Sequence, residues 1–187
     1  TIKIIPSSPH FVYTGFMSKE TADPSYFIQL LSLSSWFQSV TFDIYGNITD
    51  EIFQKLSRQN SDSLQICTHG KISHESILSV QQNAEFLINF GNSNPCAIPC
   101  KIFEYISAQR PIISLYKSDQ DASVLYLKEY PWALLLDERI PIEQNSRILK
   151  EFIARMTNAA IEHIDITSMF TNNTPEPIVH EILNIHN

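Results

Sequence analysis

Residues 99–109 contain the residue types of this chain that are best suited to hold an anion. The helix predicted for PCKIFEYISAQ begins with Pro99, Cys100 and Lys101, and its first acidic residue is Glu104. The amino terminus of a helix carries partial positive charge and unpaired N–H groups, so acidic residues are normally enriched there. A phosphate bound at this turn would explain a lysine in that place, because the N–H groups and the ammonium would hold it jointly.

Glu104 follows Lys101 by three residues, so the two side chains share one stripe of the predicted helix, while Ile102 and Ile106 can face the core. A carboxylate one turn below a phosphate is well placed to accept two hydrogen bonds from a ribose diol, as acidic residues do in dinucleotide sites. The alternative is an ordinary surface Lys–Glu ion pair, which contributes about 0.2–0.5 kcal/mol at best. The residue types alone leave both interpretations open.

The elements that must position these residues alternate along the chain. Apolar and β-branched runs predict about six strands, at 10–16, 39–46, 64–70, 85–91, 111–116 and 132–137. Helix-like runs follow them, at 23–37, 49–59, 73–84, 99–109, 123–130, 142–156 and 175–187. Such alternation predicts a Rossmann-like, doubly wound α/β fold, with a mainly parallel sheet and helices on both of its faces.

All four glycines of the chain fall at the end of a predicted strand. They are Gly15, Gly46, Gly70 and Gly91. In folds of this class, ligands bind beyond the carboxyl ends of the strands. A glycine there either makes a tight turn or lets the backbone approach a ligand closely. For a single glycine the turn is the better explanation, whereas four glycines at the same edge favour a cleft.

Composition and missing motifs exclude several classes of protein. The chain has 187 residues, of which 43% are hydrophobic, and this suits one compact domain with a core. The net charge of −7 argues against binding nucleic acid through bulk electrostatics. No G-x-S-x-G elbow, GxGxxG fingerprint or Walker A motif occurs, which argues against α/β-hydrolases and against the common dinucleotide and P-loop sites.

The three cysteines, Cys67, Cys96 and Cys100, predict no disulfide framework and favour a reducing, cytoplasmic compartment. Cys96 and Cys100, together with His69 or His74, are the candidates for a metal site. Their C-x₃-C spacing is unusual for structural zinc, however, and no second matched pair exists. We therefore predict no metal site and no cofactor.

The segment PCKIFEYISAQRPII resembles the donor-site segment of glycosyltransferases with the two-domain GT-B architecture, especially the family 4-like group (glycosyl transferases group 1). The preceding NFGNSN is similar to the strand-end loop of bacterial members. The order of elements also matches the carboxyl-terminal, nucleotide-sugar-binding domain, so the resemblance covers almost all of the chain. Only the central motif is specific, and the remainder is an analogy of fold.

The resemblance implies where the diphosphate and the ribose of a donor would lie. Glu104 would hold the ribose hydroxyls. Lys101, with the backbone around Cys100, would lie at the diphosphate end. Gly15 would begin the loop after the first strand, where backbone approaches the phosphates, and Lys19 would contact a phosphate from that loop.

The resemblance also implies the positions of the base and the sugar, while the catalytic residues stay unassigned. Gly70, Lys71 and Ile72 would line the nucleobase pocket, mostly through their main chain. Asn92 and Ser93 would lie near the sugar or the distal phosphate. The donor itself would be the substrate, so the resemblance implies no further cofactor.

Three positions depart from the family pattern. Cys96 stands where many members have an acidic residue near the transferred sugar. Phe16 stands where an arginine often follows the first-strand glycine, and Gln109 replaces the glycine usual before the basic residue and Pro111. These departures leave open the identity of the sugar and the strength of diphosphate binding. They are also compatible with a member of the family that has no catalytic activity.

We therefore expect residues 1–187 to form a single nucleotide-sugar-binding domain of a glycosyltransferase. The intact enzyme would transfer a sugar from a nucleoside diphosphate sugar to an acceptor hydroxyl, in bacterial polysaccharide or glycoconjugate synthesis. TIKIIPSSPHFVYTG resembles the start of a domain after a linker, so we expect an acceptor domain amino-terminal to it. The terminal helix within 171–187 would pack on that domain, and the isolated chain would transfer little or no sugar.

The intact enzyme is expected in the cytoplasm, with peripheral association at the inner face of the membrane left open. Its partners would be the donor and the acceptor domain, and not a nucleic acid. Two alternatives stay open. One is a non-catalytic nucleotide-binding or protein-interaction module of the same fold. The other is a sugar-nucleotide epimerase, which would release a changed donor without needing an acceptor.

Overall fold

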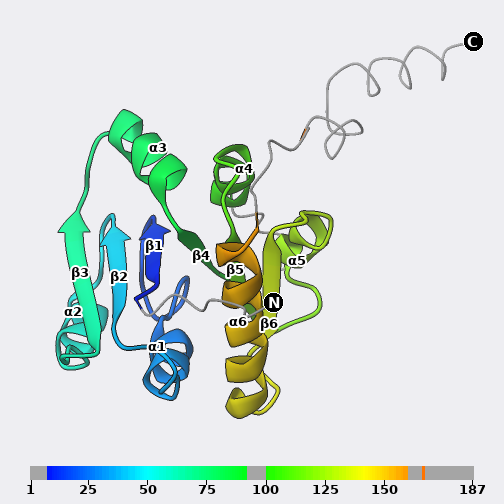
Figure 1. Cartoon of the computed structure of the whole chain (residues 1–187). Coiled ribbons are helices and arrows are strands. Elements are labelled where there is room, and N and C mark those ends of the chain that lie inside the picture. Colours follow the sequence, from blue (N-terminus) through cyan, green and yellow to red (C-terminus); the bar gives the residue numbers. More distant parts are fainter. Residues whose placement is uncertain (1–7, 92–99, 160–165, 167–187) are drawn as a thin grey trace, which may run out of the picture.

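The computed structural model describes residues 8–91, 100–159 and 166, and it is shown in Figure 1. The strands are β1 (His10–Thr14), β2 (Val40–Tyr45), β3 (Leu64–Gly70), β4 (Phe86–Phe90), β5 (Ile112–Tyr116) and β6 (Ala133–Asp137). The helices are α1 (Ser25–Ser32), α2 (Asp50–Ser57), α3 (His74–Asn83), α4 (Lys101–Ser107), α5 (Ala122–Leu127) and α6 (Ile142–Thr157). The helix predicted at 175–187 lies outside the described residues.

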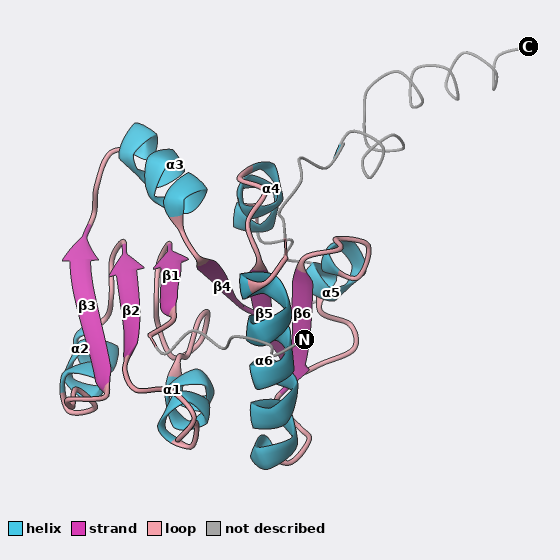
Figure 2. Cartoon of the chain, in the orientation of Figure 1, coloured by secondary structure: helices cyan, strands magenta, loops and turns pink. Residues whose placement is uncertain are grey.

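The strands form one parallel sheet in the order β3-β2-β1-β4-β5-β6, as Figure 2 shows. The predicted doubly wound α/β fold is thus confirmed. β1 and β4 are far apart in the sequence but adjacent in the sheet, where Phe11 pairs with Phe86. The winding direction reverses between these two strands, so the chain leaves their carboxyl ends toward opposite faces. Such a switch point is where folds of this class form a ligand crevice.

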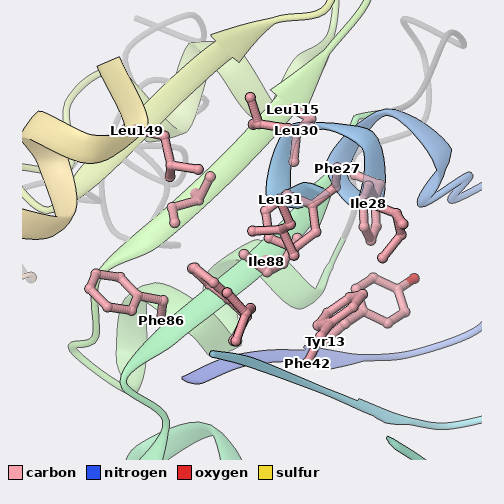
Figure 3. Packing of buried hydrophobic residues seen from close by; sticks show 14 of the residues in the cluster. Tyr13, Phe27, Ile28, Leu30, Leu31, Phe42, Phe86, Ile88, Leu115 and Leu149 are labelled. Atoms are coloured by element: carbon pink, nitrogen blue, oxygen red, sulfur yellow. The ribbon is translucent and has the colours of Figure 1, made fainter. Parts of the chain in front are cut away.

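One face of the sheet packs on α1, α2 and α6 through the larger hydrophobic cluster. The alternating burial of β2 places Phe42 on this face, where the ring of Phe27 from α1 meets it edge-on at 5.3 Å between centroids. Phe27 meets Phe11 of β1 at the same centroid distance. Leu149 of α6 and Phe86 of β4 extend the cluster, as Figure 3 shows. This aromatic layer makes the sheet a rigid support for the loops at its carboxyl edge.

The opposite face packs on α4 and α5 through a second cluster, and this face positions the predicted site. Ile102 and Ile106 of α4 are both 0% exposed, which confirms that they face the core. Their burial turns the stripe of Lys101 and Glu104 away from the sheet interior and toward the carboxyl edge of the strands. α4 is therefore held by the core, while its polar stripe stays accessible.

The structure corrects the predicted end of the first helix. The first helix ends at Ser32 rather than at residue 37, and the Ser34 hydroxyl donates back to the Leu30 carbonyl at 2.7 Å beyond that end. The Ser34 side chain therefore pairs with a backbone carbonyl of the last turn of α1. None of the described helices combines the length and the apolar composition needed to cross a bilayer.

Candidate functional site

An open cleft of about 540 Å³ lies at the carboxyl edge of the sheet, beside the switch point. Its walls come from the ends of β1 and β2, the start of α3 with the loop before it, and the first turn of α4. Six of the predicted site residues line this cleft: Gly15, Lys71, Ile72, Cys100, Lys101 and Glu104. Segments that are distant in the sequence are thus brought to one concave surface.

Two of the other predicted site residues, Gly70 and Lys19, are not among those that line the cleft. Gly70 ends β3 directly before Lys71 and is exposed, with φ +67°. Lys19 is exposed in the loop between β1 and α1. Asn92 and Ser93 lie outside the described residues.

Lys101 places an amine in the cleft, and no carboxylate of the described residues forms an ion pair with it. Its Nζ donates to the Tyr13 hydroxyl at 2.8 Å and lies 4.0 Å from the centroid of the Tyr13 ring. Burial lowers the pKa of the Lys101 ammonium to about 7. None of the ion pairs among the described residues involves Lys101. The amine is therefore held in place by a neutral partner and is available to an anion.

Tyr13 connects the amine to the loop after β1. Burial raises the pKa of the Tyr13 hydroxyl far above its usual range, so this group stays protonated. It donates to the Phe16 carbonyl at 2.7 Å while it accepts from Lys101. The Phe16 side chain is 54% exposed at the cleft. The position of Lys101 and the shape of this loop are consequently linked through one hydroxyl.

Glu104 has a different partner on the same wall of the cleft. Its Oε2 accepts from Gln81 Nε2 at 3.0 Å, and the same nitrogen donates to Thr14 Oγ1 at 3.0 Å. No ion pair joins Lys101 to Glu104 among the described residues, so the surface-pair alternative does not hold. The cation and the carboxylate are therefore separately oriented groups, one turn apart.

Tyr105 ties α4 to the end of β1. Its hydroxyl accepts from the Thr14 backbone N–H at 3.0 Å and from Thr14 Oγ1 at 3.2 Å. Tyr105 is 0% exposed and Thr14 is 1% exposed, so these bonds are shielded from water. Buried hydrogen bonds of this kind fix the distance between two elements, because breaking them leaves polar groups unpaired. The sequence offered no signal for this contact beyond a tyrosine on the buried side of the helix.

The loops after β1 and β2 touch at two glycines with positive φ. Gly15 has φ +137° and Gly46 has φ +128°. A Cβ on Gly46 would lie 2.0 Å from the Gly15 carbonyl oxygen, and a Cβ on Gly15 would lie 3.6 Å from Lys101 Nζ. These glycines therefore make tight turns and also allow a close approach of the backbone to a ligand, because the turns bring backbone without side chains next to the Lys101 ammonium.

A second polar cluster lies beside the cleft on β1, β2 and β3. Asp43 Oδ2 is 2.7 Å from His10 Nε2, and Asp43 Oδ1 is 3.0 Å from His69 Nε2. The His69 ring stacks on the cleft residue Tyr45 at 4.3 Å between centroids. Among the described residues, no group of three His, Cys, Asp or Glu side chains could hold a metal ion. The cluster therefore supports the rim of the cleft by holding His69 against Tyr45.

No protein-family model matches the chain, and no curated protein matches it in sequence. Solved structures do match. The catalytic domain of cholesterol-α-glucosyltransferase from Helicobacter pylori aligns with a TM-score of 0.58 and 16% identity, over 80% of this chain and 92% of that one. TarM of S. aureus, solved with fondaparinux, α-GlcNAc-glycerol and UDP, aligns with a TM-score of 0.64 and 15% identity. HepE of Anabaena, solved with UDP, aligns with a TM-score of 0.59 and 13% identity.

These alignments confirm the expected fold, which is that of one domain of GT-B glycosyltransferases. TarM is matched over 100% of this chain but only 37% of its own length, and HepE over 95% and 49%. The chain thus spans less than half the length of these two proteins. At such sequence identities the likeness concerns the fold, so the chemistry of the cleft has to be argued from its own residues.

Proposed function

We propose that this chain is the donor-binding domain of a glycosyltransferase and that its cleft binds a nucleoside diphosphate sugar. One observation carries this proposal: Lys101 and Glu104 line the same cleft one turn apart, and each is oriented by its own partner. An ammonium without a carboxylate suits a diphosphate, and a carboxylate suits a ribose diol. The shared GT-B fold supports this class of ligand, and the UDP named for TarM and HepE makes UDP the first nucleotide to test.

The role of this domain in transfer would be to stabilise the leaving group. As the bond between the sugar and the diphosphate breaks, negative charge develops on the diphosphate oxygens. The Lys101 ammonium, held against Tyr13, would neutralise part of that charge. The acceptor hydroxyl, of a bacterial glycan or glycoconjugate, would come from the side of a partner domain. We accordingly expect the isolated chain to bind nucleotide and to transfer little or no sugar.

Replacing Glu104 by alanine tests the proposed ribose contact. Hydrogen bonds to a charged group contribute about 1.5–3 kcal/mol, so we expect UDP affinity to fall about 10- to 100-fold. Inorganic pyrophosphate, which has no ribose, should lose little affinity. Isothermal titration calorimetry with UDP, GDP and ADP measures both the preferred base and the loss. Glu151→Ala, at an exposed position of α6, is the matched control and should bind as the wild type does.

The outcomes of this titration separate the proposal from its alternatives. Absence of binding by all three nucleotides at millimolar concentration would contradict a donor site and favour an interaction module of the same fold. Conversion of a sugar nucleotide into its epimer without any acceptor would indicate an epimerase instead. Rapid sugar transfer by this chain alone would contradict the expectation that a second domain supplies the acceptor site.

The affinity for UDP is expected to fall as the pH rises through 7. Burial lowers the pKa of Lys101 to about 7, so above that pH the free protein holds an uncharged amine. A bound diphosphate favours the charged form, so binding takes up a proton and the Kd should rise about tenfold per pH unit there. Calorimetry in two buffers of different ionisation enthalpy measures this uptake. Lys101→Met should show no such uptake, and an identical pH profile in that variant would assign the titration to another group.

A further inference from the structure

Gln81 joins three elements of the site through one side-chain amide. It is 0% exposed, and it is the only residue of α3 that is buried. Its Nε2 donates to Thr14 of β1 and to Glu104 of α4, both at 3.0 Å. A helix that buries a single residue would be expected to use an apolar one, because burying an amide costs free energy unless it is hydrogen-bonded. The identity of this residue therefore calls for a reason beyond packing.

The directions of the hydrogen bonds follow from the chemistry of the groups. A carboxylate can only accept, so the amide nitrogen of Gln81 must face Glu104. The same nitrogen donates to Thr14 Oγ1, which leaves the Thr14 hydroxyl proton to donate to Tyr105 at 3.2 Å. Gln81 Oε1 is then buried without a hydrogen-bond partner among the described residues. The orientation of the Gln81 amide that lets its N–H donate to Glu104 thus leaves the Gln81 amide oxygen without a hydrogen bond among the described residues.

Glu104 has two spaces into which its carboxylate could turn. It lines the main cleft, and it also lines a separate groove of about 310 Å³ between α3 and α4, on the side of Leu78 and Phe103. The nitrogen that holds Oε2 also bonds to Thr14, and Thr14 lines the main cleft. Gln81 itself lines the groove and is not among the residues that line the cleft. Its Nε2 nevertheless ties Glu104 Oε2 to Thr14 on the cleft side, so the amide opposes rotation of the carboxylate into the groove. An orientation set before the ligand arrives lowers the entropic cost of binding.

We propose that Gln81 is a positioning residue that sets how strongly the cleft discriminates ribonucleotides from deoxyribonucleotides. It does so by holding the Glu104 carboxylate toward the ligand hydroxyls, and it does not touch the ligand itself. This inference rests on the proposed function, because Glu104 must accept from a ribose. Glu104 Oε1 has no hydrogen-bond partner in the described part of the chain, which leaves it available to a ligand hydroxyl.

The test compares Gln81→Met with wild type for three ligands: UDP, 2′-deoxy-UDP and inorganic pyrophosphate. Methionine keeps the length of the side chain and removes both donors. In the wild type, we expect UDP to bind at least about tenfold more tightly than 2′-deoxy-UDP. This ratio corresponds to the lower end of the free energy that a hydrogen bond to a charged group contributes. In Gln81→Met this ratio should fall to about one to three, while pyrophosphate affinity changes less than about twofold. Gln82→Met, at the exposed neighbouring position of α3, should keep the wild-type ratio.

Two outcomes of the titration would overturn the inference. One is an unchanged ratio in Gln81→Met, and the other is an equal loss for all three ligands, which would indicate general damage to the fold. A thermal unfolding curve of each variant separates that damage from a local effect.

If the wild type binds no nucleotide, the proposed function fails, and the discrimination between ribonucleotides and deoxyribonucleotides cannot be measured. A measurement without ligand then tests separately whether Gln81 positions Glu104. The Gln81 side-chain amide protons are then followed by NMR in the wild type and in Glu104→Ala. One of them should shift upfield and exchange faster with water once its acceptor is removed. Unchanged resonances would show that Gln81 does not position Glu104 at all.

Discussion

Replacing Lys101 by methionine is expected to weaken the binding of UDP by about 100-fold or more at pH 6.5, since charge-assisted hydrogen bonds to a diphosphate contribute about 1.5–3 kcal/mol each. The ammonium lies against Tyr13 in a partly buried position, where its charge is poorly screened by water. Methionine keeps the apolar stem of the side chain and removes only the charged end. Calorimetric titration of UDP and of pyrophosphate measures the loss, which should be similar for the two ligands because both carry the diphosphate.

The fold should tolerate this substitution well. Because burial lowers the pKa of Lys101, the charged form is disfavoured in the folded state, and the wild type gains stability as the pH rises from about 7 toward the ordinary lysine pKa. Near pH 6.5 we therefore expect Lys101→Met to be no less stable than the wild type in urea denaturation. Lys128→Met, exposed at the end of α5, makes the same change of charge and should leave UDP affinity unchanged.

Equal affinities of the wild type and Lys101→Met would show that the diphosphate does not lie at this amine. The other lysines named from the sequence then become the candidates. Lys71 lines the cleft, and Lys19 is exposed in the loop after β1. Lys71→Met and Lys19→Met in the same titration would identify which of them contacts the phosphates.

Replacing Gly46 by alanine is expected to lower the free energy of unfolding by about 3 kcal/mol or more. The residue has φ +128°, and its new Cβ would lie 2.0 Å from the Gly15 carbonyl oxygen. The backbone cannot move away cheaply, because Gly15 N–H donates to the Tyr45 carbonyl at 2.8 Å and Gly46 N–H donates to the Gly70 carbonyl at 2.8 Å. Displacing Gly15 should also weaken UDP binding, since Gly15 lines the cleft.

Gly70→Ala provides the matched control for this substitution. Gly70 also has a positive φ, of +67°, but a Cβ there would meet no atom within 4 Å. Its cost should be only that of the left-handed conformation, about 1–2 kcal/mol. Urea denaturation of both variants, analysed by linear extrapolation, gives the two free energies. If the two substitutions cost the same, the contact between the loops after β1 and β2 is not tight.

The fold could be predicted from the sequence because its signals are local. Runs such as PIISLY and FLINF are nearly continuous in apolar residues, with one polar residue each, which is typical of strands covered on both faces. They form β5 and β4 at the predicted places. The spacing of Lys101 and Glu104 also sufficed to put both on one stripe of a helix, and both line the cleft. Helix and strand periods repeat within a few residues, so the chain itself encodes them.

The partners of these residues were decided only by the tertiary structure. Tyr13, which holds Lys101, and Gln81, which holds Glu104, are 88 and 23 residues away from them in the sequence. No local pattern relates such positions. They meet only when β1 and β4 pair in the sheet and α3, in the connection from β3 to β4, packs close to β1. The sequence by itself thus determined the elements and the type of chemistry at the start of α4. Strand order and packing decided which way each polar side chain points, since a hydrogen bond depends on distances that only the folded chain fixes.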